Sequence, residues 1–344
     1  MSHAPQTVSR APVWFVPTSV AVAVLSIMLA VFIGVVDIPP ADILAALQGH
    51  GSAEARSIIL DIRLPRILTG MLAGIHFAVA GLILQMITRN PLADPSIMGV
   101  SQGATLAVSL FLLLTVYIDN PGSNTLAELP IAWLPGVGAV GGLAAGAAIY
   151  LLAFRQNLGP LRITICGIAV GAVLHAVAIG LIAGWGSARI EILLEWLSGS
   201  LYARSWRHVM FLLPFTVVGL SLLPLLRRSL DLLRFDAPVA RSFGLGYRFH
   251  FSLALALSCS LAASAVGVVG PIIFVGLIVP HLARLLAGRR FTLVLPLTIT
   301  LGIVVVTLGD LAGRVLGQAE EVPIGVITAI FGVPVLIALL RRVP

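Results

Sequence analysis

Long apolar runs, separated by short polar segments, follow one another along almost the whole chain. Each run is long enough to predict a membrane-crossing helix, because about 20 apolar residues span the hydrocarbon core of a bilayer. Nine long runs contain no Asp, Glu or Arg: 11–36, 67–88, 95–118, 129–154, 163–188, 208–226, 249–283, 291–309 and 322–340.

The seventh run is too long for one crossing. A helix over 249–283 would measure about 52 Å at 1.5 Å per residue. Gly267, Gly270 and Pro271 lie near its middle, where these residue types most readily interrupt a helix. Division of this run gives ten predicted crossings and an all-α membrane protein. We expect one transmembrane domain over 1–344.

Composition supports this fold class. Of 344 residues, 59% are hydrophobic and 10% are charged, against about 25% charged residues in an ordinary soluble domain. So few charges cannot cover a water-soluble enzyme. The first run is longer than the apolar region of a typical signal peptide and is followed by no A-x-A site, which favours an uncleaved helix. Cys166 and Cys259 fall inside predicted helices and read as small buried residues.

All 21 basic residues are arginines. Without lysine the chain cannot contain a standard P-loop, whose lysine holds phosphate. The arginines are scattered between apolar runs, which argues against nucleic-acid binding. With the N-terminus inside and ten crossings, 14 arginines lie on the cytoplasmic side and 7 on the other. This asymmetry predicts cytoplasmic N- and C-termini.

Two segments combine charge with turn-forming residues. The segment 61–66 reads DIRLPR, and Pro65 suits the first turn of a helix; its arginines predict either an interfacial anchor or a docking point for acidic groups of an external partner. The segment 89–95 reads RNPLADP. Its prolines and Asn90 predict a rigid cytoplasmic turn, which could simply connect two helices or could form a gate.

Two further segments are not simply apolar. The longest cytoplasmic loop, about 227–250, alternates large apolar residues with charge. This pattern favours a short helix on a partner surface, and the alternative is a helix on the membrane interface. The segment 267–284 contains Pro280, which should kink a helix. His281 and Arg284 follow it and share a helix face.

Taken together, these motifs resemble the permease subunits of ABC importers for iron-siderophores, haem and cobalamin, the FecCD or BtuC type. The resemblance covers about residues 20–342 and rests on RLPR, NPLADP, GPIIFVGLIVPHLAR, GDLAGR and EVPIGVITAIFGVP in this order. It implies a type II importer permease with ten helices and no cofactor of its own. It also implies a second permease subunit, a pair of cytoplasmic ATPase subunits that bind ATP and Mg, and a periplasmic or lipid-anchored binding protein.

The resemblance also implies roles for individual residues. Arg63 and Arg314 match positions that dock the binding protein, and Arg66 is a further candidate. Those expected at the ATPase interface, in the coupling loop, are Ala240, Arg241, Phe243 and Gly244. Those matching the inner gate are Asn90, Leu92, Pro160 and Leu161.

The cargo is less well defined. The second gate segment reads Gly159-Pro160-Leu161, where the cobalamin-type member has small hydroxylated residues. We expect a ferric siderophore, with haem or cobalamin as alternatives. We expect no metal site, although His76, His175 and His281 lie in or near the membrane and leave a contact with cargo open.

Two other classes of function are disfavoured. An ion-coupled secondary transporter would need acidic residues near the membrane midplane. The predicted helices contain only Asp310, at the outer end of the ninth. A membrane enzyme would need a cluster of catalytic residues, and no spacing in the sequence indicates one.

Overall fold

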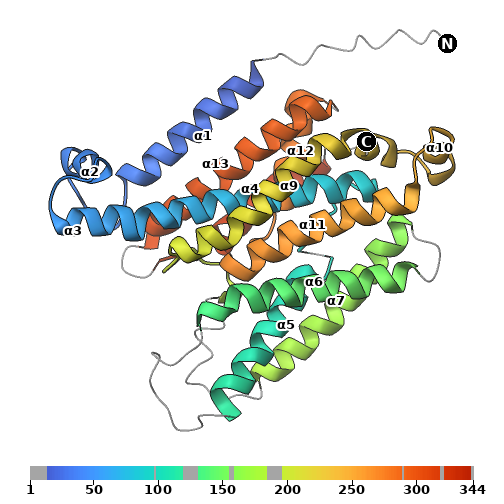
Figure 1. Ribbon diagram of the computed structural model, residues 1–344, viewed down its shortest axis with the longest axis horizontal. Helices are drawn as coiled ribbons and strands as arrows, with labels where there is room; N and C mark the ends of the chain where they lie inside the picture. Colours follow the sequence, from blue (N-terminus) through green and yellow to red (C-terminus); the bar gives the residue numbers. More distant parts are fainter. Residues whose placement is uncertain are drawn as a thin grey trace.

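The computed structural model describes residues 14–96, 98–118, 131–154, 159–183, 196–288, 290–317 and 321–341, and these residues form helices and connecting segments without strands (Figure 1). The predicted all-α fold class is confirmed. In chain order the helices are α1 (Phe15–Phe32), α2 (Pro40–Leu47), α3 (Ala53–Arg56), η1 (Ser57–Arg63), α4 (Leu64–Thr88), α5 (Val100–Leu112), η2 (Leu113–Ile118), η4 (Ile131–Trp133), α6 (Leu134–Phe154), α7 (Pro160–Ala183), α9 (Trp206–Leu233), α10 (Ala237–Ser242), α11 (Tyr247–Val269), α12 (Val275–Ala287), α13 (Phe291–Gly317) and α14 (Ile324–Leu340).

Within the described residues, seven helical spans are long and apolar enough to cross a membrane. Three shorter apolar helices correspond to α5, α12 and α14. These ten segments coincide with the ten predicted ones. Whether all three shorter helices cross the membrane stays a prediction. The division of the run 249–283 is confirmed, because α11 ends at Val269 and Gly270 has a φ of 74°.

Helix α4 forms the axis of the molecule and packs against α9, α11, α12 and α13 (Figure 1). Small residues allow these close contacts. A Cβ on Gly74 would overlap the carbonyl oxygen of Gly302 in α13, and a Cβ on Gly81 would overlap that of Gly276 in α12. In a bilayer, where apolar burial drives helix association weakly, such backbone approach is a main source of packing energy.

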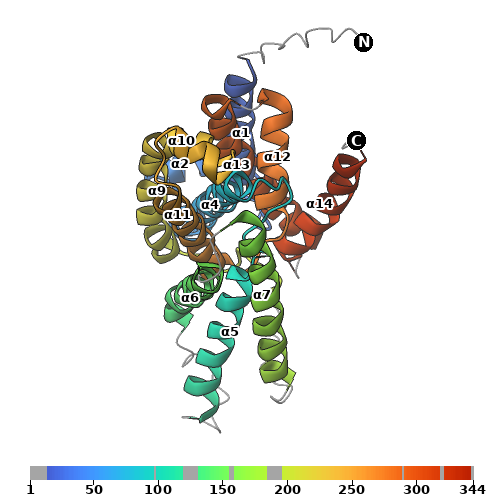
Figure 2. The same cartoon turned by 90° about the vertical axis from the view of Figure 1, so that its right-hand side faces the viewer.

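Two parts of the chain project from this core. Helices α5, α6 and α7 pack against one another and extend from one side of it, joined to it mainly through α6 and α11 (Figure 2). Helix α14 contacts α12 and α13 and diverges from α7 in the same view. The core therefore carries two arms whose outer faces are apolar.

Two sequence-based boundaries need correction. Pro65 lies in the first turn of α4, but the chain is already π-helical over Ser57–Arg63, so the arginine segment belongs to one helical span over Ala53–Thr88. The coupling loop expected at about 227–250 is shorter, because α9 continues to Leu233 and α11 begins at Tyr247. Apolar packing against the core extends both helices beyond the charged residues that suggested a loop.

Candidate functional site

Arg66 joins three parts of the chain at one end of α4. Its Nη2 lies 2.7 Å from Asp310 Oδ1 and 2.8 Å from Glu321 Oε2, and its Nη1 donates to Glu321 Oε1 at 2.8 Å. The side chains of Arg66, Asp310 and Glu321 are 12%, 6% and 22% exposed. They border a cavity of about 290 Å³ that Tyr202 also lines. A planar guanidinium suits this double pairing, since it presents several fixed donors.

Arg63 and Arg314 lie next to this cluster and are buried. Arg63 donates to the carbonyl oxygens of Val31 and Val36 at 2.7 and 2.9 Å, and Arg314 Nε lies 3.1 Å from Asp310 Oδ2. Each of the two arginines is only 5% exposed. The Arg63 guanidinium therefore faces the chain's own oxygens, which differs from the direct contact with a partner that the resemblance implies, whereas Arg314 Nη2 has no hydrogen-bond partner among the described residues.

The turn after α4 has a defined shape. Arg89 adopts a left-handed conformation (φ 56°) at the end of the helix, and Asn90 Oδ1 accepts the Leu92 N–H at 2.9 Å. The carbonyl oxygen of Asn90 also accepts the Ala93 N–H at 3.1 Å. The Asn90 side chain thus holds the turn, as Asn commonly does. Leu92 is 37% exposed and points out of it.

The second predicted gate segment lies at the start of α7. Pro160 is half-buried and opens the helix, and Leu161 is 72% exposed. Leu92 and Leu161 each present an apolar side chain away from the core. Their assembly into one gate stays a prediction.

Asp94, which belongs to the predicted turn RNPLADP, is a buried acid. It is 3% exposed, and its Oδ1 accepts the Ser96 N–H at 2.7 Å and the Ser96 hydroxyl. Its Oδ2 lies 2.9 Å from the position of a Cβ on Gly276, beside the start of α12. Burial raises the pKa of Asp94, and the bonds from Ser96 oppose that rise. In the sequence, the signal for this contact is Asp94 together with a glycine, Gly276, near the start of α12.

The predicted coupling residues lie on α10 and directly after it, and they differ in exposure. Phe243 is 59% exposed, and Arg241 and Gly244 are also exposed. Gly244 has a φ of 79°, a conformation that glycine adopts readily, and ends the helix. Ala240 needs correction, because it is fully buried in the core cluster that contains α9 and α11 residues. Ala240 anchors α10 and does not face a partner.

Of the three histidines in or near the membrane, His76 is hydrogen-bonded within the chain. His76 is fully buried between Ser264 Oγ, 3.0 Å from Nδ1, and Thr216 Oγ1, 2.7 Å from Nε2. His175 is exposed on α7 and His281 is half-buried. Among the described residues, no three His, Cys, Asp or Glu side chains gather as a possible metal site.

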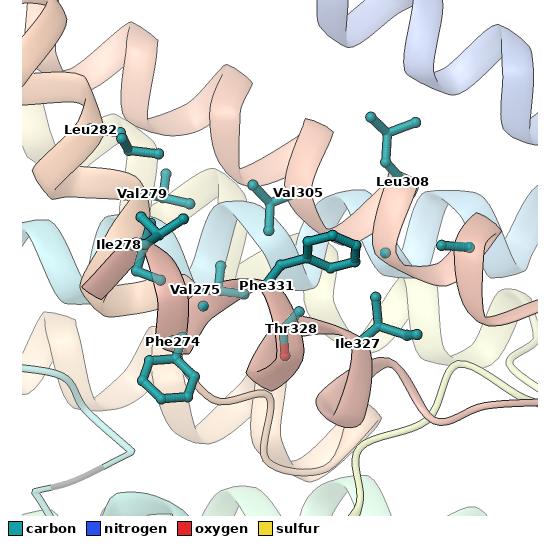
Figure 3. Close-up of a pocket in the computed structure, with 14 residues that line it drawn as sticks. Phe274, Val275, Ile278, Val279, Leu282, Val305, Leu308, Ile327, Thr328 and Phe331 are labelled. Atoms are coloured by element: carbon teal, nitrogen blue, oxygen red, sulfur yellow. The ribbon is translucent and has the colours of Figure 1, made fainter. Parts of the chain in front are cut away.

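An apolar cavity of about 370 Å³ lies between α12, α13 and α14 (Figure 3). Phe274, Ile278 and Phe331 are among the side chains that line it, and Thr328 is its one polar lining side chain. Such a cavity offers almost nothing to hydrogen-bond a polar metal chelate, so it suits an acyl chain or an apolar helix face instead.

Comparison with known proteins identifies the family to which this chain belongs. The sequence model of the FecCD transport family matches residues 22–342. The chain belongs to this family. The predictions of an all-helical fold and of a permease subunit are confirmed. The match extends over nearly the whole length of the chain.

Individual relatives match over similar lengths. The iron-uptake system permease protein FeuC of Bacillus subtilis is 33% identical over 90% of this chain and 91% of its own. The ferric enterobactin transport system permease protein FepD of Escherichia coli is 33% identical over 95% of each chain. An inward-facing conformation of a metal-chelate type ABC transporter superposes with a TM-score of 0.83 and 26% identity, covering 96% of this FecCD chain and 99% of its own.

Proposed function

We propose that this FecCD protein is the permease subunit of an ATP-driven importer that moves a ferric siderophore from an external binding protein into the cytoplasm. The observation that carries the proposal is the match to the FecCD family over 22–342, together with the full-length likeness to a metal-chelate ABC transporter. The similar permeases are named for iron, ferric citrate, ferric hydroxamate and ferric enterobactin transport. Haem and cobalamin are the alternative cargoes.

ATP hydrolysis belongs to a separate subunit. The chain contains no lysine, and a standard P-loop requires one. In the proposed assembly a pair of cytoplasmic ATPase subunits binds ATP and Mg, and a second permease copy or a related permease completes the pathway. The chain is a multi-pass membrane protein, and we place its N- and C-termini on the cytoplasmic side of the cell membrane.

We assign the two functional surfaces to opposite ends of α4. Arg66 and Arg89 are 23 residues apart, about 34 Å along a helix, which is close to the roughly 30 Å of a hydrocarbon core. The Arg66 end would receive the binding protein, and the Arg89 end would receive the ATPase pair. This separation is enough to place the two ends on opposite sides of a bilayer.

Docking at the outer end works through the arginine cluster. Arg66 borders the 290 Å³ cavity, so an acidic side chain of the binding protein can compete there with Glu321 for the guanidinium. Arg63 and Arg314 are buried and hold the segment 31–36 and Asp310 in place. They affect docking by positioning the surface, or they contact the binding protein themselves once the segment 31–36 has moved.

At the inner end, α10 presents Arg241 and Phe243 to the ATPase. Asn90, Leu92, Pro160 and Leu161 form the proposed gate. Nucleotide-driven movement of the ATPase pair would reach the gate through α10, and cargo would pass when the gate opens.

The test is transport by membrane vesicles that contain the permease and its ATPase subunits. With ferric citrate, a ferric hydroxamate or ferric enterobactin as probe, uptake should require ATP and stop with vanadate, while an ionophore leaves it unchanged. Uptake that stops with the ionophore and persists with vanadate would instead indicate an ion-coupled transporter.

A further inference from the structure

An ion pair joins the proposed gate to the proposed coupling helix. Arg89 Nη1 contacts Asp236 Oδ1, and the two residues are 147 positions apart in the sequence. Arg89 directly follows α4, and Asp236 directly precedes α10. The pair therefore connects two elements whose roles were assigned independently of it.

On the coupling side, α10 is a short helix with a small anchor. It has six residues, and its buried side chain is Ala240. Leu245, whose N–H donates to the Ala240 carbonyl oxygen at 3.2 Å, adds a second buried side chain just beyond it. These apolar contacts attach α10 to α9 and α11. Asp236, directly before α10, reaches Arg89 at the start of the turn after α4, and Tyr247 at the start of α11 also lies beside Arg89.

On the gate side, Arg89 is the first residue of the turn. Arg89 is adjacent to Asn90, and the Asn90 side chain and carbonyl oxygen hold the Leu92 and Ala93 amides. Asp94 at the other end of the turn is buried beside the start of α12. The turn thus has a buried residue, Asp94, at one end and the ion-paired Arg89 at the other, with the exposed Leu92 between them.

We propose that Arg89 and Asp236 are a positioning pair that transmits movement of α10 to Leu92. The inference rests on the proposed function and adds the connection between its two inner parts. The side chains of Arg89 and Asp236 are 29% and 76% exposed, so the pair contributes modestly to stability. Its effect should instead appear in how strongly nucleotide controls the gate, by about two- to fivefold, the factor that an exposed ion pair supplies.

The experiment measures the gate directly, without cargo. Leu92→Cys is introduced in a chain carrying Cys166→Ala and Cys259→Ala, and the permease is reconstituted with its ATPase subunits. A membrane-impermeant maleimide labels the new cysteine with and without ATP and vanadate. The wild-type pair should give a nucleotide-dependent labelling rate. Arg89→Gln and Asp236→Asn should each reduce that dependence by about two- to fivefold, while ATP hydrolysis continues.

Exchange of the two charges distinguishes the proposed link, the ion pair between Arg89 and Asp236, from a simple structural effect of either substitution. The double variant Arg89→Asp, Asp236→Arg should recover nucleotide-dependent labelling relative to either charge-reversed single variant. Asp231→Asn is the matched control, because Asp231 lies in α9 and pairs with Arg234 at 3.7 Å, and it should leave labelling unchanged.

The outcomes are distinguishable. If labelling in the wild-type pair does not respond to nucleotide, the proposed gate fails and the link fails with it. If the wild-type pair responds and Arg89→Gln and Asp236→Asn respond equally, the gate stands and the link is overturned. An equal loss in Asp231→Asn, or no recovery in the charge exchange, also overturns the link.

Discussion

The charged residues of this chain are few, and several are enclosed by helices. Arg66 shows how such a residue is accommodated, because Asp310 and Glu321 surround one guanidinium with two carboxylates. Removing one member of a buried ionic group leaves its partners uncompensated, which costs more than the group itself contributes.

Arg66→Gln should therefore lower the free energy of unfolding by about 2–3 kcal/mol. The loss stays moderate because Arg314 still pairs with Asp310 and because Glu321 is partly exposed. Thermal unfolding of the detergent-solubilised protein would measure it. Arg56→Gln is the control, since Arg56 is exposed on the same helical span. Equal Tm values for the two variants would contradict a structural role for the Arg66 cluster.

Asp94 predicts a pH dependence of stability. Burial raises its pKa in the folded protein above the unfolded value of about 3.9. As pH rises above that value, the unfolded chain ionises first, so the folded state loses stability until the buried carboxyl ionises as well. In Asp94→Asn this loss is absent. The Tm of the variant relative to wild type should thus increase from pH 4.5 to pH 8, and a difference independent of pH would contradict the prediction.

At the scale of elements, the helices are held by close backbone approach as well as by apolar side chains. Helix α4 meets α12 at Gly81 and Gly276, and the Gln85 amide donates to the carbonyl oxygens of Gly276 and Leu277 at 3.2 and 3.1 Å. The contact is small-residue packing reinforced by a polar side chain.

Gly81→Ala should separate α4 from α12 and lower the Tm strongly, because the new Cβ would overlap a backbone oxygen that cannot move aside alone. Overpacking of this kind typically costs about 1–3 kcal/mol. Gly180→Ala in α7 is the matched control, since a Cβ there has nothing within 4 Å. If both variants unfold at the wild-type temperature, the α4–α12 contact is looser than described.

Helix α10 divides its residues between anchor and partner surface. Ala240 is buried, while Phe243 and Arg241 are exposed. The double variant Phe243→Ala, Arg241→Ala should insert normally and lose most co-purification with the ATPase subunits. Pull-down from membranes, with Val217→Ala on the exposed side of α9 as control, would measure this. If the double variant recovers as much of the ATPase subunits as the wild-type protein does, α10 is not part of the interface.

At the scale of the whole molecule, the two proposed surfaces lie at opposite ends of the central helix. Tyr202 borders the cavity beside Arg66, and Phe243 directly follows α10. A chain that spans the membrane must place these two ends in different compartments.

A cysteine in place of Tyr202 should therefore react with an impermeant maleimide from outside intact cells. A cysteine in place of Phe243 should react only in inside-out vesicles. Both side chains are more than half exposed, so accessibility in the fold is not limiting. Labelling of Phe243→Cys from outside would reverse the orientation and, with it, both surface assignments.

Much of this architecture follows from the sequence alone. The cost of placing charge in a bilayer confines Asp, Glu and Arg to the ends of apolar runs, so those runs predict where the helices lie. Gly270 and Pro271 likewise predict the break between α11 and α12, because both residue types disfavour a continued helix. These are local preferences, and local preferences are visible along the chain.

Tertiary structure alone decided which charges distant in the sequence meet. Arg63 and Arg66 are three residues apart in the sequence, yet Arg63 binds backbone oxygens near α1 and Arg66 binds carboxylates near α13 and α14. Ala240 is buried and Phe243 exposed, and Arg89 meets Asp236 across 147 positions. Such outcomes depend on how separate helices are oriented about α4, and no preference of a single segment encodes that orientation.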